Sequence, residues 1–128
     1  MAGSVKLLVV DDDAGSLAAL ADILSMEGYL VETVANGQEA LDHLRAAASP
    51  PALIVLDLFM PVMDGWQFLA EMKIDPKLSQ FRIPVIVITA LNAKVEEADA
   101  IIRKPVDLVR LLQTVTRLIG TAHKDSSS

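Results

Sequence analysis

Aspartate side chains follow two apolar runs of this sequence where each run ends. Asp11, Asp12 and Asp13 come directly after VKLLVV (5–10), and Asp57 comes near the end of ALIVLDL (52–58). Grouped carboxylates repel one another and raise each other's pKa unless a cation lies between them. Carboxylate oxygens, with carbonyl and water oxygens, are the ligands that Mg²⁺ prefers. These aspartates therefore indicate a site for a divalent cation.

A hydroxyl and an ammonium follow two further apolar runs. Thr89 ends VIVIT (85–89), and Lys104 follows the short run AII (100–102). Mg²⁺ with a lysine and a hydroxyl describes a phosphoryl site, because phosphoryl transfer mainly needs positioning and charge neutralisation from the protein. One of the aspartates is then a candidate nucleophile that forms an aspartyl phosphate.

The elements that must position these residues alternate along the chain. Strands are predicted at residues 5–10, 29–34, 52–58 and 85–89, with a short fifth at 100–102. Helices are predicted before Gly28, from Asn36 to the prolines at 50–51, from near Asp64, and over residues 107–119 with Gly120 at the end. Strands of Val, Ile and Leu suit a parallel sheet buried on both faces. The predicted class is α/β, a doubly wound sheet of about five parallel strands, in which ligands bind beyond the carboxyl ends of the strands.

Composition narrows the classes of function. The chain has 128 residues, 17 acidic and 11 basic side chains, a formal net charge of −6 and no cysteine. One domain is expected, and a disulfide framework, a zinc ribbon and a thiol nucleophile are excluded. Net acidity argues against nucleic acid or an anionic membrane as a main ligand. No signal peptide or stretch of ~18 apolar residues is present, so we expect a soluble, cytoplasmic protein.

Four motifs resemble the receiver domain of bacterial two-component response regulators, including the single-domain type found in chemotaxis. They are LLVVDDD (7–13), IVLDLFMPVMDG (54–65), VIVITA (85–90) and RKP (103–105), in the family's order. The resemblance implies a flavodoxin-like strand order of 2-1-3-4-5. We expect a receiver domain over residues 1–121 and a disordered tail or linker stub over 122–128.

The resemblance also implies a role for each residue at the metal site. Asp57 would be the phosphoacceptor and a metal ligand. Asp12 would bind Mg²⁺ directly, Asp11 would act mainly through its waters, and the backbone carbonyl of Phe59 would supply another ligand.

Two further residues would contact the phosphoryl group. By the same resemblance, Thr89 would hydrogen-bond it as the switch hydroxyl, and Lys104 would neutralise one of its oxygens. The family often has a cis peptide before the next residue, here Pro105. Asp13, by contrast, reads as a helix N-cap.

The implied function is phosphorelay signalling. Asp57 would accept a phosphoryl group, in a Mg²⁺-dependent reaction, from a histidine kinase or a histidine phosphotransfer protein. The modified domain would switch a protein–protein interaction surface toward an unknown downstream protein. The domain would catalyse only its own phosphorylation and dephosphorylation and would not otherwise be an enzyme. We expect a monomer or weak dimer without direct contacts to nucleic acid or membrane.

Two other functions compete with this reading. A haloacid-dehalogenase-like phosphatase also uses Mg²⁺ and an aspartyl phosphate. It requires a second Asp two residues after the nucleophile, where this chain has Phe59. A degenerate receiver that serves only as a scaffold is disfavoured by the complete set of five site residues.

The chain departs from the family's pattern in two places. Only nine residues, 91–99, connect the fourth strand to the fifth, fewer than a helical crossover normally needs. We expect a shortened fourth helix of one or two turns, or an irregular and mobile connection. Ile101 stands where many receivers carry an aromatic residue that moves with the switch hydroxyl, so we hypothesise that this aromatic switch is absent or replaced.

Apolar residues flank the expected site. Phe59 and Leu91 stand two positions after Asp57 and Thr89. Their bulk would screen an acyl phosphate from attacking water, which predicts a long-lived phosphorylated state.

Overall fold

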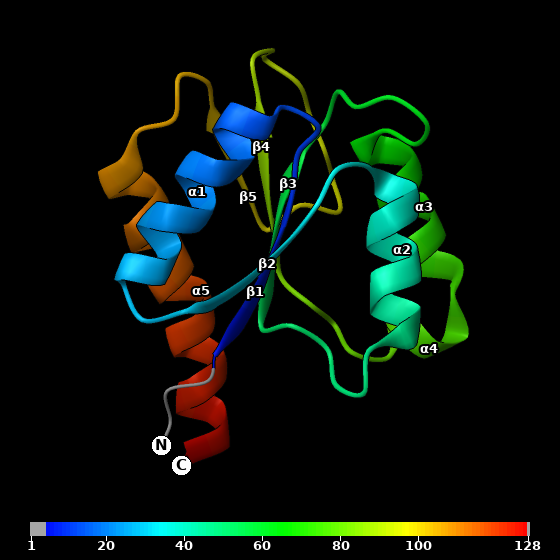
Figure 1. Ribbon diagram of the computed structural model, residues 1–128. Helices are drawn as coiled ribbons and strands as arrows, with labels where there is room; N and C mark the ends of the chain where they lie inside the picture. Colours follow the sequence, from blue (N-terminus) through cyan, green and yellow to red (C-terminus); the bar gives the residue numbers. More distant parts are fainter. Residues whose placement is uncertain (1–4, 128) are drawn as a thin grey trace.

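Five strands form one parallel sheet in the computed structural model, which describes the backbone of residues 5–127 and the side chains of residues 5–120. The strands are β1 (Lys6–Val10), β2 (Leu30–Val34), β3 (Leu53–Asp57), β4 (Val85–Thr89) and β5 (Ala100–Arg103). Their order is β2-β1-β3-β4-β5, as the resemblance implied. The helices are α1 (Ala14–Met26), α2 (Gly37–Ala46), α3 (Gly65–Ile74), α4 (Pro76–Ser79) and α5 (Leu108–Ser127). Figure 1 shows α1 and α5 on one side of the sheet and α2, α3 and α4 on the other, so the doubly wound α/β class is confirmed.

Alternate residues of the central strands supply two separate hydrophobic cores. On one face Leu8 packs with Leu41 of α2 and Phe68 of α3. On the other face Leu7 packs with helices α1 and α5. Because β1, β3 and β4 have a helix layer on both sides, successive side chains are buried in all of them except at Lys6, the first residue of β1, and their sequences show no polar alternation.

A polar side chain caps the first turn of each helix that follows a strand, and at α5 it is Asp107, which accepts a hydrogen bond from the amide of Arg110. Asp13 accepts a hydrogen bond from the amide of Ser16, so the N-cap reading of this residue is confirmed. Asn36 accepts from the amide of Glu39 and begins α2. Asp64 begins α3 with a reciprocal capping box to Gln67. These caps determine where the chain turns after it leaves the carboxyl edge of the sheet.

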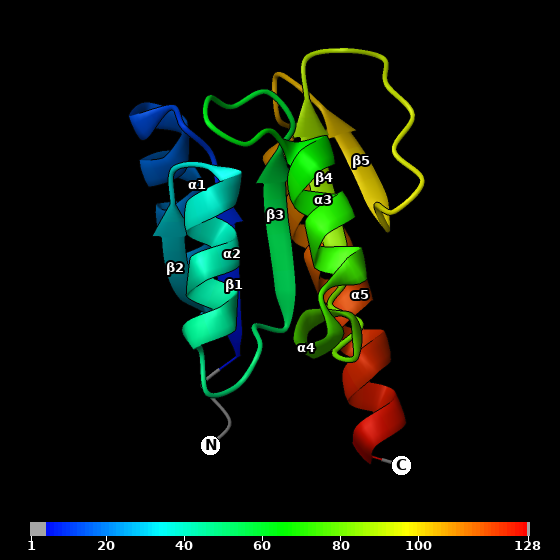
Figure 2. The same ribbon diagram turned by 90° about the vertical axis from the view of Figure 1, so that its right-hand side faces the viewer.

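The connection from β4 to β5 is irregular. No helix forms between Thr89 and Ala100, and Figure 2 shows this segment as a long loop beside β5. Val95 is buried against the core that contains Phe68 and holds the loop to the molecule. Of the two alternatives expected here, the irregular connection is confirmed and the short helix is wrong, because nine residues are too few for a helix and both of its loops. The mobility of this loop stays a prediction.

Two other helices differ from expectation. Helix α4 (Pro76–Ser79) was not predicted, although Asp75 as its N-cap and a proline at its first turn are typical start signals. Helix α5 runs past Gly120 to Ser127, so the predicted end at that glycine was too early. The division into a domain over 1–121 and a tail over 122–128 stays a prediction. Within the described residues, no helix is long and apolar enough to cross a bilayer.

Candidate functional site

The predicted site residues come together at the carboxyl edge of the sheet, which is uppermost in Figure 2. Asp11 follows β1 directly, Asp57 is the last residue of β3, and Lys104 follows β5. One carboxylate oxygen from each of Asp11, Asp12 and Asp57 lies within 4.8 Å of the others. The Nζ atom of Lys104 lies 3.4 Å from Oδ1 of Asp57. Strands distant in the sequence thus bring together three carboxylates and one ammonium group.

The three aspartates differ in exposure. Asp11 is 2% exposed and Asp57 is 6% exposed, whereas Asp12 faces solvent. Oδ1 of Asp11 accepts a hydrogen bond from the amide of Asp13 at 2.9 Å, which orients this carboxylate at the end of β1. The cluster therefore has a buried floor and an open side through which an ion can enter.

Burial makes the charge of these carboxylates unfavourable. It raises the pKa of Asp57, and the nearby charge of Asp11 raises it further, while Lys104 opposes both effects. Burial also raises the pKa of Asp11, against the effect of its backbone hydrogen bond. One lysine does not balance three carboxylates, and a divalent cation with oxygen ligands would relieve their repulsion. The observed donor set therefore fits Mg²⁺.

Thr89 lies fully buried at the end of β4. The sheet register pairs Asp57 with Ile88, and it pairs Thr89 with Arg103, next to Lys104. The Thr89 hydroxyl oxygen accepts a hydrogen bond from the amide of Leu91 at 3.1 Å. The register places this hydroxyl between the strand that ends in Asp57 and the strand that precedes Lys104. The peptide between Lys104 and Pro105 is cis.

An exposed aromatic pair lies in and beside the loop after Asp57. The rings of Phe59 and Trp66 meet edge to face with their centroids 5.2 Å apart, and 48% of Phe59 is exposed. The amide of Gly65 donates to the carbonyl of Leu58 at 2.8 Å, which closes this loop onto the end of β3. The assignment of the Phe59 carbonyl as a metal ligand stays a prediction.

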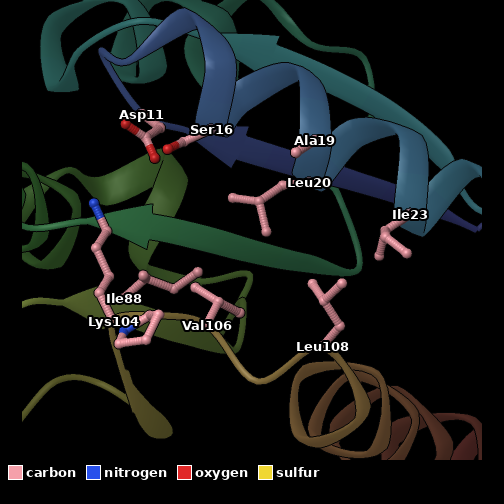
Figure 3. A pocket seen from close by; sticks show the side chains of 10 residues that line it. Asp11, Ser16, Ala19, Leu20, Ile23, Ile88, Lys104, Val106 and Leu108 are labelled. Carbon is pink, nitrogen blue, oxygen red and sulfur yellow. The ribbon is translucent and has the colours of Figure 1, made fainter.

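A pocket opens between α1 and the segment after β5. Its volume is about 280 Å³, and Figure 3 shows Asp11, Ser16 and Lys104 at one end, with Leu20, Ile23 and Leu108 along the rest. The sequence reasoning did not include Ser16 or these apolar residues in the site. No motif in the sequence indicates a cavity there, because it forms only where α1 packs beside the β5–α5 connection.

Comparisons with known proteins agree on one family. The response regulator receiver domain family matches residues 7–116. Response regulator Rre1 of Synechocystis is 31% identical over 136 residues, covering 100% of this chain and 57% of the relative. Response regulator PleD of Caulobacter vibrioides is 36% identical over 122 residues, covering 90% and 26%. The chain thus spans little more than half of one of these relatives and about a quarter of the other.

Solved structures show the same fold. The receiver domain of a signal transduction histidine kinase from Syntrophus aciditrophicus superposes with a TM-score of 0.79 at 35% identity, covering 91% of this chain and 90% of that one. The receiver domain of a sensor histidine kinase from Pseudomonas aeruginosa, solved with a magnesium ion in its active-site cleft, has a TM-score of 0.79 at 25% identity, covering 91% and 98%. On the matched residues, the sheet order and the residues at the strand ends, this chain belongs to the response regulator receiver domain family of two-component systems.

Proposed function

We propose that this domain accepts a phosphoryl group on Asp57 from a phosphohistidine and thereby switches a protein-binding surface. The observation that carries the proposal is the position of Asp57, a buried carboxylate 3.4 Å from Lys104 and within 4.8 Å of carboxylate oxygens of Asp11 and Asp12. A buried carboxylate at the end of a strand is held in one place, which favours its use as a nucleophile.

Asp57, Lys104 and Thr89 would act together in a single phosphoryl transfer. An oxygen of Asp57 forms the new P–O bond while the P–N bond of the donor breaks, and the electron pair of that bond stays on the donor imidazole. Lys104, now paired with Asp57, keeps its proton and forms an ion pair with a phosphoryl oxygen, and the hydroxyl of Thr89 donates a hydrogen bond to another. The hydroxyl can donate this bond while it accepts one from the amide of Leu91, because a hydroxyl has one donor and two acceptor positions.

Mg²⁺ fits the same site. Asp11, Asp12, Asp57 and the carbonyl of Phe59 would hold it, and it would supply positive charge opposite the phosphoryl oxygens. The neighbouring receiver domain solved with magnesium in its cleft supports this proposal.

The proposed partners follow from the reaction. The donor is a histidine kinase or a histidine phosphotransfer protein, and the output is a contact with a downstream protein. Receiver domains are signalling domains, and we propose that this one modifies only itself. A cytoplasmic location remains a prediction.

Intact mass after incubation with Mg²⁺ and acetyl phosphate tests this function. We expect one phosphoryl group on the wild-type chain and none on Asp57→Asn. Asp22→Asn, a change of an exposed carboxylate on α1, is the matched control and should be phosphorylated like the wild type. Hydrolysis of many donor molecules without a stable adduct would instead favour the phosphatase, and no adduct with no turnover would favour the scaffold.

A further inference from the structure

The start of α2 lies directly against the loop that follows Asp57. The amide of Gly37, which is buried, donates a hydrogen bond to the carbonyl of Met63 at 3.0 Å. A Cβ atom at position 37 would lie 2.8 Å from this carbonyl oxygen and 2.8 Å from Cγ of Met63. A side chain can rotate away from such a contact, but the backbone oxygen can move only with the loop. Any residue other than glycine here would therefore displace the loop.

The loop has little freedom to absorb such a displacement. The amide of Met63 donates to the carbonyl of Pro61 at 2.7 Å, which makes a tight turn centred on Val62. Val62 has φ +68°, a conformation that is strained for a β-branched residue. Beyond this turn, the amide of Gly65 is bonded to the carbonyl of Leu58. A shift at Met63 must therefore pass back along the chain toward Phe59.

We infer that Gly37 is a positioning residue for the proposed magnesium site, and that it acts through Met63 on the loop that presents the carbonyl of Phe59. The inference rests on the proposed function, because it concerns the same site. The contact joins α2, which carries none of the predicted site residues, to the backbone between the phosphoacceptor and α3. The strained turn at Val62 persists only where its surroundings hold it. The hydrogen bond from Gly37 to Met63 is one of the contacts that hold it.

Mg²⁺ binding to three variants tests the inference. Gly37→Ala adds the methyl group that meets the Met63 carbonyl. Asn36→Ala removes the N-cap of the same helix and leaves that contact in place. Gly120→Ala adds a methyl group where no atom lies within 4 Å. The dissociation constant for Mg²⁺ is measured by isothermal titration calorimetry on each, with Trp66 fluorescence as a second signal.

We expect Gly37→Ala to weaken Mg²⁺ binding about tenfold or more, which is the usual effect of losing a residue that orients a metal ligand. Asn36→Ala and Gly120→Ala should stay within about twofold of the wild type. If Gly37 served only to stabilise α2, Asn36→Ala would weaken binding as much as Gly37→Ala, and that result would overturn the inference.

Gly37→Ala should also change how the phosphorylation rate depends on the Mg²⁺ concentration. For Gly37→Ala, the Mg²⁺ concentration that gives half of the maximal rate with acetyl phosphate should rise about tenfold. The rate at saturating Mg²⁺ should change less than about twofold, because Asp57 and Lys104 belong to other elements. Equal Mg²⁺ dependence in variant and wild type would count against the inference alone, whereas a wild-type chain that binds no Mg²⁺ would count against the proposed site itself.

Hydrogen exchange of the wild-type chain tests the same contact without a variant. Linkage requires that Mg²⁺ binding stabilise the Gly37–Met63 hydrogen bond if that bond favours Mg²⁺ binding. The amide of Gly37 should exchange more slowly with Mg²⁺ than without it. The amide of Ala40, bonded to the carbonyl of Asn36 within the same helix, is the reference. Equal slowing at both amides, or none at Gly37, would overturn the inference.

Discussion

Asp57 is a carboxylate whose burial disfavours the charge that its proposed chemistry needs. Its pKa lies above the ordinary value of 3.8, mainly because of burial and the neighbouring Asp11. Between pH 3.8 and that raised pKa, the folded chain therefore binds more protons than the unfolded chain. By linkage, the free energy of unfolding falls as the pH rises through this range, and the loss is complete above it.

Asp57→Asn should therefore stabilise the metal-free domain at neutral pH. We expect a gain in the free energy of unfolding at pH 7 in urea, which shrinks as the pH falls through the raised pKa of Asp57 and disappears below its ordinary value of 3.8. Asp22→Asn should change this energy by less than about 0.5 kcal/mol at either pH. A gain from Asp57→Asn that is the same at neutral and acidic pH would refute the electrostatic explanation.

Phe59 should lengthen the life of the phosphorylated state. Its half-exposed ring packs on Trp66 two positions after Asp57, the proposed phosphoacceptor, where its bulk would limit the approach of water. Phe59→Asn should shorten the lifetime of phosphorylated Asp57 several-fold, measured by intact mass after the donor is removed. Ile74→Asn, the same kind of change at an apolar residue that is 73% exposed at the far end of α3, is the control and should leave the lifetime unchanged. A wild-type half-life of seconds that Phe59→Asn does not alter would contradict this prediction.

At the scale of elements, the β4–β5 connection distinguishes this chain from the family's usual pattern. It contains no helix, and its described contacts are few. The side chain of Val95 is buried, and the amide and the carboxylate of Asp99 bond to the backbone of Val85 at 2.8 Å each. The described chain therefore presents no helical surface between β4 and β5. Ile101 is half-buried beside the same loop, and its role in the switch stays a hypothesis.

Hydrogen exchange should detect this irregular segment. Residues 92–94 have no regular secondary structure, whereas residues 85–89 form a central strand. We expect the amides of 92–94 to exchange at least tenfold faster than those of 85–89, because local opening needs little free energy where few contacts are buried. Slow exchange throughout 91–99 would show that the connection is rigid.

At the scale of the molecule, the site and the stability of the fold are coupled. Folding brings the carboxylates of Asp11, Asp12 and Asp57 close together at two strand ends. Their mutual repulsion opposes folding, so the rest of the fold must compensate for it. A cation that binds only the folded chain shifts the unfolding equilibrium toward the folded state.

Mg²⁺ should therefore raise the thermal unfolding midpoint of the wild-type domain. At 100 times the dissociation constant, the expected gain is about 2.7 kcal/mol. Asp12→Asn, which changes the exposed carboxylate of the cluster, should lose most of this gain, whereas Asp42→Asn on α2 should keep it. Equal stabilisation of the wild type, Asp12→Asn and Asp42→Asn by Mg²⁺ would show that the effect is one of ionic strength.

The sequence alone determined the fold class, the strands and the placement of Asp11, Asp12, Asp57, Thr89 and Lys104 at strand ends, because apolar period and the residue types after each run are local signals. The roles of these residues stay predictions. It also indicated that the β4–β5 connection was too short for a full helix. It did not indicate the length of α5, since the glycine at 120 reads as a stop signal whether or not the helix continues.

Only the tertiary structure decided how the site is held. The approach of Gly37 to Met63, the strained turn at Val62 and the pocket beside Ser16 each depend on two segments that meet only after folding. Neither sequence period nor motif spacing encodes such distances. The physical reason is that a local pattern specifies which face of an element is buried, whereas contacts between elements depend on how the whole core packs.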